Sequence, residues 1–460
     1  MTNLDDLITR YRKELERHPP EDTGRAAAFS NLADSLVDRF IETNEIADID
    51  EAVALHRSAL ELRSPGHSLR ADTLNSLARA LRRRFRKLGL NADLDEAISL
   101  NRSALNDCPE DRSQPLHDLA LCLGHRYDEQ GIVTDLEEAI TLGQAALSLR
   151  LPGHPRRADA LYDVANNLRR RFLNHGMNAT DLDEAISLHR SALDLSPGSD
   201  PARSYSLHQL ALSLSDRYDI QGTITDLDEA IALSRAALEP RSSSNRGDVA
   251  KTLFNLGTFL RDRFLKLDAV ADLDEAISLH RLALNLRPAG HPDRMQSLHM
   301  LALCLGDRYD HLGTMADLEA AITLGRAELE LPPSDRFDRA STLTNLGMSL
   351  HDRFLKLGGS ADLNEAISLH RLASDLRPSG HPKQSKLLHN LARYLSDRYD
   401  QEGAVADLDE AITLSRAMLK HPPSDPFDHA DTLSELGDRL HNRFLKLGAN
   451  ADLDDAISLH

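Results

Sequence analysis

The chain has 460 residues, of which 54 are Lys or Arg and 73 are Asp or Glu, giving a formal charge of −19. Such an acidic protein repels phosphate backbones, so we do not expect nucleic acid as a partner. No apolar run is long enough to cross a membrane, and Cys108, Cys122 and Cys304 lack the spacing of a disulfide framework or a zinc site. We expect a cytoplasmic protein, because unpaired thiols are typical of a reducing compartment.

The first predicted helix covers residues 3–19. It follows the pattern of the later helices but has Leu7 and Glu14 where they have Ala. This difference is expected of a helix that closes an array and meets solvent on its outer face. We assign residues 1–47 to an atypical N-terminal capping repeat.

From residue 48 the pattern Asp-Leu-Asp-Glu-Ala-Ile, with small variations, returns every 42 to 46 residues. A fixed period of this size predicts an array of stacked units, none of which can bury its apolar face alone. Residues 48–451 form the predicted solenoid of nine repeats, and residues 452–460 begin a tenth repeat that is cut short. The repeats open at Asp48, Asp93, Asp135, Asp181, Asp226, Asp272, Asp317, Asp362, Asp407 and Asp452.

Each repeat is predicted to form two helices, because apolar residues recur with helical spacing on both sides of a proline. Asp93 and Glu96 have the side chains of a capping box, so we expect the opening Asp to be an N-cap. The other helix ends at a residue that tolerates a left-handed backbone, usually Gly but Asn44 and Asp268 in two units. The prolines that end the helix after the Asp are Pro109, Pro197, Pro288, Pro333, Pro378 and Pro423.

This unit resembles a tetratricopeptide repeat, although about 45 residues is longer than the usual 34 and Leu often stands where that family has Trp. The matching residues are Ala97, Ile98, Ala104, Leu105 and Pro109 for the second helix of that family and Leu116, Leu119, Ala120 and Leu123 for the first. The resemblance implies an all-α protein, a right-handed α-solenoid of about ten antiparallel helix hairpins.

Two sequence motifs of this chain are similar to those of the long tetratricopeptide arrays of mushroom-type fungi. They are Asp-Leu-Asp-Glu-Ala-Ile-Ser-Leu-His-Arg and, at residues 287–292, Arg-Pro-Ala-Gly-His-Pro. In many of those arrays a caspase-like CHAT protease domain follows. The resemblance therefore implies a fungal origin and two alternative functions. The chain is either a scaffold or sensor that binds a protein or peptide, or the regulatory array of a cysteine protease whose catalytic domain lies beyond residue 460. The incomplete last repeat leads us to expect that further sequence follows.

An Arg precedes the aromatic residue near the end of every helix that leads to an opening Asp. We expect it to pair with a carboxylate at the start of the next helix, such as Asp93 or Glu96 for Arg84, rather than to form a row of anion sites. The ten positions are Arg39, Arg84, Arg126, Arg171, Arg217, Arg263, Arg308, Arg353, Arg398 and Arg443.

The histidines and cysteines do not point to an enzyme. The 21 histidines are spread over different elements without a His-Glu-x-x-His motif or a cysteine pair, so we expect no metal site. Cys122 and Cys304 share a repeat position that Ser213 fills elsewhere, whereas a nucleophile needs its own partner base. We predict no catalytic residues and no cofactor.

The remaining candidate is a groove, because the first helices of tetratricopeptide arrays line the concave face. The resemblance implies that a protein or peptide binds there, and spacings of four and three residues keep the candidates of one helix on one stripe. The alternative, given equal weight, is that these residues only pack between hairpins. A Lys/Asn clamp for a terminal carboxylate is not consistently present. The candidates are Asn75, Arg79, Arg82, His117, Leu121, Tyr162, Asn166, Arg169, His208, Leu212, Phe254, Thr258, Arg261, His299, Leu303, His389 and Arg393.

Overall fold

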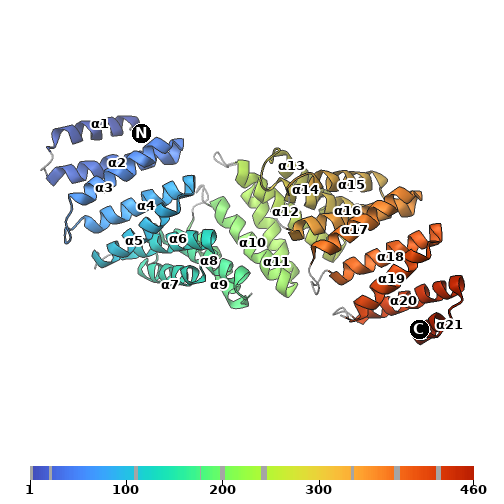
Figure 1. Cartoon of the computed structure of the whole chain (residues 1–460). Helices are drawn as coiled ribbons and strands as arrows, with labels where there is room; N and C mark the ends of the chain where they lie inside the picture. The colour runs from blue at the N-terminus through green and yellow to red at the C-terminus, as the bar shows by residue number, and fades with distance from the viewer. Residues whose placement is uncertain are drawn as a thin grey trace. The chain divides into compact units, whose positions relative to one another are not determined.

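The computed structural model describes residues 4–19, 23–107, 112–176, 178–196, 203–239, 246–332, 336–377, 384–420 and 426–459. These residues form α-helices joined by short turns and include no strand, which confirms the predicted all-α fold (Figure 1). The chain divides into two compact units, residues 1–239 and 240–460, and each is described by itself. Within the described ranges, no helix combines the length and apolar character that a membrane span requires.

The helices of the first unit are α1 (Leu4–Arg17), α2 (Thr23–Thr43), α3 (Ile46–Glu61), α4 (Arg70–Leu88), α5 (Asn91–Asp107), α6 (Ser113–Gln130), α7 (Val133–Leu149), α8 (Arg157–Asn174), α9 (Ala179–Leu195), α10 (Arg203–Gln221) and α11 (Ile224–Ala237). Those of the second unit are α12 (Arg246–Leu267), α13 (Val270–Asn285), α14 (Arg294–Leu312), α15 (Met315–Leu329), α16 (Arg336–Leu357), α17 (Ser360–Leu376), α18 (Gln384–Glu402), α19 (Val405–Lys420), α20 (Pro426–Leu447) and α21 (Asn450–Leu459).

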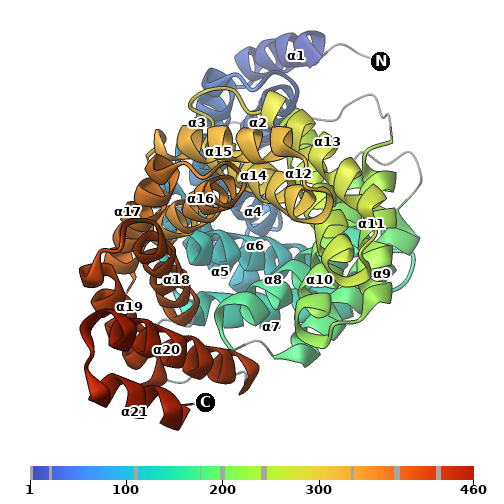
Figure 2. The ribbon, with the colours of Figure 1, turned by 90° about the vertical axis from the view of Figure 1, so that its right-hand side faces the viewer.

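Each even-numbered helix from α2 onward packs closely against the odd-numbered helix that follows it, so the two form a hairpin. Figure 2 shows α18 with α19 and α20 with α21 as two successive hairpins. Even-numbered helices also contact the next even-numbered helix, as α4 does with α6 and α6 with α8. Within each compact unit, the even-numbered helices therefore share a face, which we call the inner face of that unit.

The turn between the helices of a hairpin confirms the predicted left-handed positions. The backbone N–H of Gly89 donates to the carbonyl of Phe85 at the end of α4, and Gly89 has φ 70°. Asn44 and Asp268 take the same conformation, with φ 62° and 58°. Among the predicted helix-ending prolines, Pro288 follows the end of α13 at Asn285. The others, Pro109, Pro197, Pro333, Pro378 and Pro423, lie outside the described residues.

The prediction that the opening Asp is an N-cap is wrong. Helix α5 begins at Asn91, two residues before Asp93, and α3 begins at Ile46, two residues before Asp48. The Asp thus lies in the first helical turn, where its negative charge is favourable next to the positive end of the helix dipole. Its carboxylate is bound by an Arg from the preceding helix instead of by backbone N–H groups.

The core is shared between neighbouring hairpins. In the first unit, one cluster of buried apolar residues extends from Ile8 on α1 to Ala139 on α7. In the second unit, a cluster extends from Tyr309 on α14 to Ala411 on α19. Burial of apolar surface is the main favourable contribution to folding, so each hairpin depends on its neighbours for stability, as the repeat period predicts. The predicted domain boundaries stay predictions. They are residues 1–47 for the N-terminal cap, 48–451 for the solenoid and 452–460 for the incomplete repeat.

Candidate functional site

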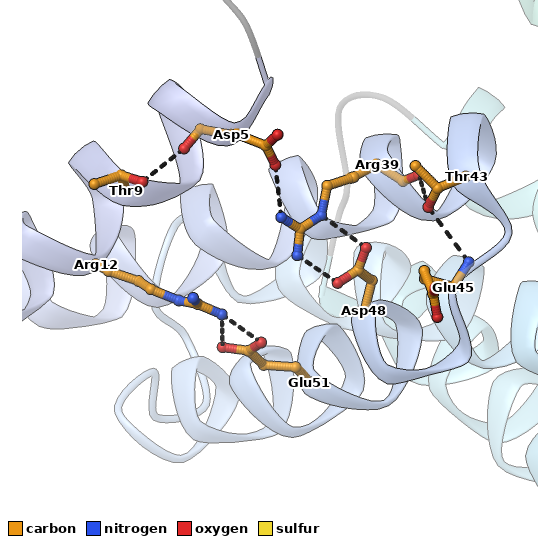
Figure 3. Close-up of polar contacts among 8 residues, drawn as sticks. All are labelled: Asp5, Thr9, Arg12, Arg39, Thr43, Glu45, Asp48 and Glu51. Carbon is orange, nitrogen blue, oxygen red and sulfur yellow. Dashed lines mark hydrogen bonds and ion pairs between the residues drawn. The ribbon is translucent and has the colours of Figure 1, made fainter.

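The repeated Arg and the opening Asp form what we call the Arg–Asp ladder. Arg39 on α2 donates from Nε and Nη2 to the two carboxylate oxygens of Asp48 at 2.8 and 2.6 Å. Its Nη1 donates to Asp5 on α1 at 2.8 Å, so a single guanidinium joins three helices (Figure 3). These hydrogen bonds raise the pKa of Arg39 above its usual range. The prediction of a structural ladder is confirmed.

The ladder is present in all ten positions. The pairs are Arg39–Asp48, Arg84–Asp93, Arg126–Asp135, Arg171–Asp181, Arg217–Asp226, Arg263–Asp272, Arg308–Asp317, Arg353–Asp362, Arg398–Asp407 and Arg443–Asp452. The alternative partner for Arg84 was Glu96, but Glu96 instead binds Arg57 of the preceding odd-numbered helix, at 2.6 Å. The ladder guanidiniums are engaged by carboxylates and do not form a row of anion sites.

The candidate groove residues differ in exposure. Asn75 and His117 are buried, Arg393 is exposed, and the other candidates are half-buried. Asn75 donates to Asn101 and to Asp118, both at 3.1 Å, so it serves packing between helices. Arg393 lies over the ring of its neighbour Tyr394.

The two aromatic candidates pack against neighbouring rings. The ring of Tyr162 meets the edges of His189 and Tyr205 at centroid distances of 5.6 and 6.3 Å. Phe254 lies 5.3 Å from His280, and the guanidinium of Arg287 stacks 5.0 Å from its centroid. Aromatic side chains packed in this way combine a fixed geometry with a remaining surface for contact.

A cavity of about 530 Å³ in the first unit brings five of the candidates together. Arg79 and Arg82 reach it from α4, His117 and Leu121 from α6, and Tyr162 from α8. The sequence did not single out its other lining residues, which are Arg83, Gln114, Asp118, Arg156, Asp159, Asp163, Tyr205 and Ser206. The signal that could have found Arg83, Asp118 and Asp163 is that they lie beside the candidate stripe on the same helices.

The charges in this cavity strongly affect one another. Burial, together with the neighbouring cations Arg82, Arg79 and Arg86, lowers the pKa of Arg83 to about 10. Asp163, which also lines the cavity, keeps 26% of its side-chain surface accessible. Its removal from bulk water nevertheless raises the pKa of this carboxyl to about 7. The cavity thus combines three arginines of α4 with three carboxylates of α6 and α8, and Arg156 lies directly before α8.

A second, smaller cavity of about 90 Å³ in the other unit includes two more candidates, His299 and Leu303. The buried carboxylate of Glu328 lies 3.1 Å from Nδ1 of His299 and accepts a hydrogen bond from Thr342 at 2.6 Å. This carboxylate is satisfied by its neighbours. Neither cavity includes the remaining candidates, which are Asn75, Asn166, Arg169, His208, Leu212, Phe254, Thr258, Arg261, His389 and Arg393.

The cysteines lack the setting of a nucleophile. Cys122 and Cys304 are fully buried, and burial raises the pKa of each thiol to about 12, whereas nucleophilic attack requires the thiolate. Cys108 lies outside the described residues. In the part of the chain that the structure describes, no three His, Cys, Asp or Glu side chains are placed to hold a metal ion.

Comparison with known proteins agrees with the architecture. A model of the tetratricopeptide repeat matches residues 204–243, 249–293 and 386–428. A search of curated protein sequences finds no significant match. Solved structures with some similarity include YrrB, described as a TPR protein with an unusual peptide-binding site. It is 19% identical, covers 50% of this chain and 97% of its own, and has a TM-score of 0.33.

Two further structures have comparable scores. A monomeric mutant of IFIT1 with m7Gppp-AAAA is 14% identical, covers 99% of this chain and 95% of its own, and has a TM-score of 0.39. BtubC from P. vanneervenii is 20% identical, covers 53% of this chain and 98% of its own, and has a TM-score of 0.34. The chain is thus an all-α protein built of helix hairpins, and three of its segments match the tetratricopeptide repeat.

Proposed function

We propose that the chain binds a peptide or protein on its inner face and acts as a scaffold or sensor without catalytic activity of its own. The observation that carries the proposal is the 530 Å³ cavity, to which α4, α6, α8 and α10 all contribute side chains. Its lining combines two aromatic rings with charged groups. Tyr and Arg are the residues enriched where proteins recognise partners, and a site spread over successive helices suits an extended segment.

The test is selection of binding peptides from a random decapeptide library with the full chain, followed by fluorescence anisotropy of the selected peptides. Replacing Leu121 and Tyr162 with Ala should weaken binding at least tenfold, because both side chains line the cavity. The matched control is Arg57→Ala, since Arg57 is exposed on an odd-numbered helix and pairs with Glu96. Circular dichroism confirms that both variants keep their helices. Equal affinity of the cavity variant and the control would contradict the proposal.

A second function rests on the similarity of the repeat sequence to that of fungal arrays that precede CHAT domains. In this proposal the chain regulates a cysteine protease encoded beyond residue 460, in the cytoplasm of a fungus. Translation of the genomic sequence that follows codon 460 tests it. An α/β domain with paired His and Cys motifs would support protease regulation, and an immediate stop codon would exclude it.

A further inference from the structure

An ion pair links neighbouring even-numbered helices at several places on the inner face. Nε of Arg169 on α8 donates to Asp216 on α10 at 2.5 Å. Nε of Arg261 on α12 donates to Asp307 on α14 at the same distance. In each case the cation stands two residues before a ladder Arg, and the carboxylate stands one residue before the next ladder Arg. His351 on α16 and Asp397 on α18 repeat the arrangement at 2.6 Å.

This pattern is broken at Arg82, which occupies the same position on α4 as Arg169 does on α8. The residue that should supply the carboxylate on α6 is His125, not Asp. Burial, reinforced by Arg82, Arg86 and Arg170, lowers the pKa of His125 to about 3. The ring is therefore neutral at physiological pH and supplies no negative charge to Arg82.

In the described part of the chain, no carboxylate accepts a hydrogen bond from Arg82 in place of the missing one, although Asp118 forms a long ion pair with it. The closest approach is 3.9 Å, from Nη2 of Arg82 to Asp118, and Asp118 already accepts hydrogen bonds from Asn75 and Gln114. The Nε atoms of Arg82 and Arg83 are buried and have no hydrogen-bond partner among the described residues. Buried donors of this kind are costly unless a ligand satisfies them.

The acidic residue is replaced on three consecutive even-numbered helices, by an arginine on two of them and by the neutral His125 on the third. The position before the ladder Arg carries Arg83 on α4, His125 on α6 and Arg170 on α8. On six other even-numbered helices this position is acidic: Asp38, Asp216, Asp262, Asp307, Asp352 and Asp397. Arg170 pairs with Asp128 at 2.9 Å, so Arg82 and Arg83 are cations left without a hydrogen-bonded carboxylate in the described ranges. Their positive charge, in a chain of charge −19, favours an anionic partner.

We propose that the cavity between α4, α6 and α8 binds a peptide segment through an Asp or Glu side chain, whose carboxylate takes the place of the missing Asp beside Arg82 and Arg83. This proposal rests on the proposed peptide-binding function and specifies its ligand. A guanidinium pairs with a planar carboxylate through charge-assisted hydrogen bonds. Leu121, Tyr162 and the half-exposed ring of Tyr205 offer apolar contact to the residues on either side of the acid.

The carboxylates of the cavity favour a peptide over a nucleic acid. Asp118, Asp159 and Asp163 line the same cavity as the arginines, and Asp118 lies 3.9 Å from Arg82. A nucleic acid carries a negative charge on every nucleotide, and its neighbouring phosphates would meet these carboxylates. A peptide can present one acid to the arginines and a neutral or basic residue to these carboxylates.

The test uses the full chain, the strongest peptide from the decapeptide selection, and the same peptide with every Asp and Glu changed to the amide. We expect the amide version to bind at least tenfold more weakly. Arg82→Gln combined with Arg83→Gln should cause a similar loss, whereas Arg57→Gln should change the affinity less than twofold. Selected peptides without an excess of acidic residues, or equal binding of the amide version, would overturn the proposal.

The decisive variant is His125→Asp, which gives α6 the residue that α10, α14 and α18 carry. Its carboxylate should engage Arg82 from within the chain and lower peptide affinity at least tenfold. His125→Asn changes size without adding charge, and it should bind within threefold of the native chain. If His125→Asp does not fold, the arginine pair decides the outcome.

Two further outcomes distinguish the proposals from each other. If His125→Asp and the arginine variants leave peptide affinity unchanged while the Leu121 and Tyr162 variant loses it, the proposal of peptide binding is supported. The proposal that an Asp or Glu side chain is recognised is then contradicted. If no peptide is selected, both proposals fall. A labelled single-stranded RNA decamer that binds, and loses affinity in the arginine variants, would overturn the peptide as the ligand.

Discussion

Arg84 holds Asp93 through two parallel hydrogen bonds, 2.7 Å from Nε and 2.6 Å from Nη2, across the two-residue turn between α4 and α5. Its third nitrogen donates to Asp50 on α3 at 3.1 Å. The guanidinium therefore fixes the angle within one hairpin and also the position of the hairpin before it. Because this Arg–Asp pair recurs in every repeat, the same contact sets the geometry of the hairpins throughout each compact unit.

We expect Arg84→Ala to lower the free energy of unfolding by about 3 kcal/mol, because it leaves the buried carboxylate of Asp93 without its partner. Arg57→Ala removes an equally short contact to Glu96, but both side chains are more than one-third exposed. That loss should be below about 1 kcal/mol. Urea unfolding followed by circular dichroism measures both. Equal losses for the two variants would mean that burial of the ladder does not matter.

Gly347 allows a close approach of α16 to His370 on α17. A Cβ atom at Gly347 would lie 2.6 Å from Cε1 of this ring. Gly347→Ala should lower the free energy of unfolding by about 1–2 kcal/mol, since overpacking outweighs the gain of up to about 1 kcal/mol from helix propensity.

The corresponding positions of the next hairpin carry Ala392 and Ser415, which provide the matched control. Adding His370→Ser to Gly347→Ala should recover part of the lost stability. A double-mutant cycle measures this coupling. Additive losses would show that the ring and the glycine do not restrict each other.

Buried histidines make the fold sensitive to mild acid. His280 is fully buried, and burial together with Arg261 and Arg287 lowers its pKa to about 4. Its unfolded-state pKa is about 6.5. Between these values the unfolded chain takes up a proton that the folded chain does not, so stability is complete above about pH 6.5 and declines as the pH falls toward 4.

We expect His280→Asn to reduce the slope of unfolding free energy against pH by up to about 1.4 kcal/mol per pH unit within this window. Asn is chosen because Asn101 occupies the same repeat position on α5. Urea titrations at pH 7.0, 6.0 and 5.0 give the slope. An unchanged slope would show that His280 binds its proton equally in both states.

The buried thiols should be inert in the folded chain. We expect iodoacetamide at pH 8 to leave Cys122 and Cys304 unmodified, because burial raises the pKa of both thiols to about 12 and only the thiolate reacts. Peptide mass spectrometry with and without urea measures the modification. Rapid labelling of either residue without urea would contradict the burial seen in the structure.

Some features could be predicted from the sequence because they depend on residues close along the chain. The helical faces around Leu94 and Leu119 and the left-handed position at Gly89 follow from local spacing and backbone preference. Arg84 lies only nine residues before Asp93, so a pairing with a carboxylate at the start of α5 was also predictable, with Asp93 and Glu96 as the alternatives. The N-cap prediction was wrong because the sequence places Asp93 near a helix start without showing whether a backbone N–H or Arg84 binds it.

The sequence by itself determined the repeat period, the all-α class and a ladder between the repeated Arg and a carboxylate of the next helix, since these depend on the chemistry of a single repeat. Only the tertiary structure decided that Glu96 pairs with Arg57 and that Arg82, His117 and Tyr162 line one cavity. The physical reason is that these contacts join different hairpins, whose packing angles depend on all the side chains between them. Any one repeat, taken alone, carries too little information to specify that packing.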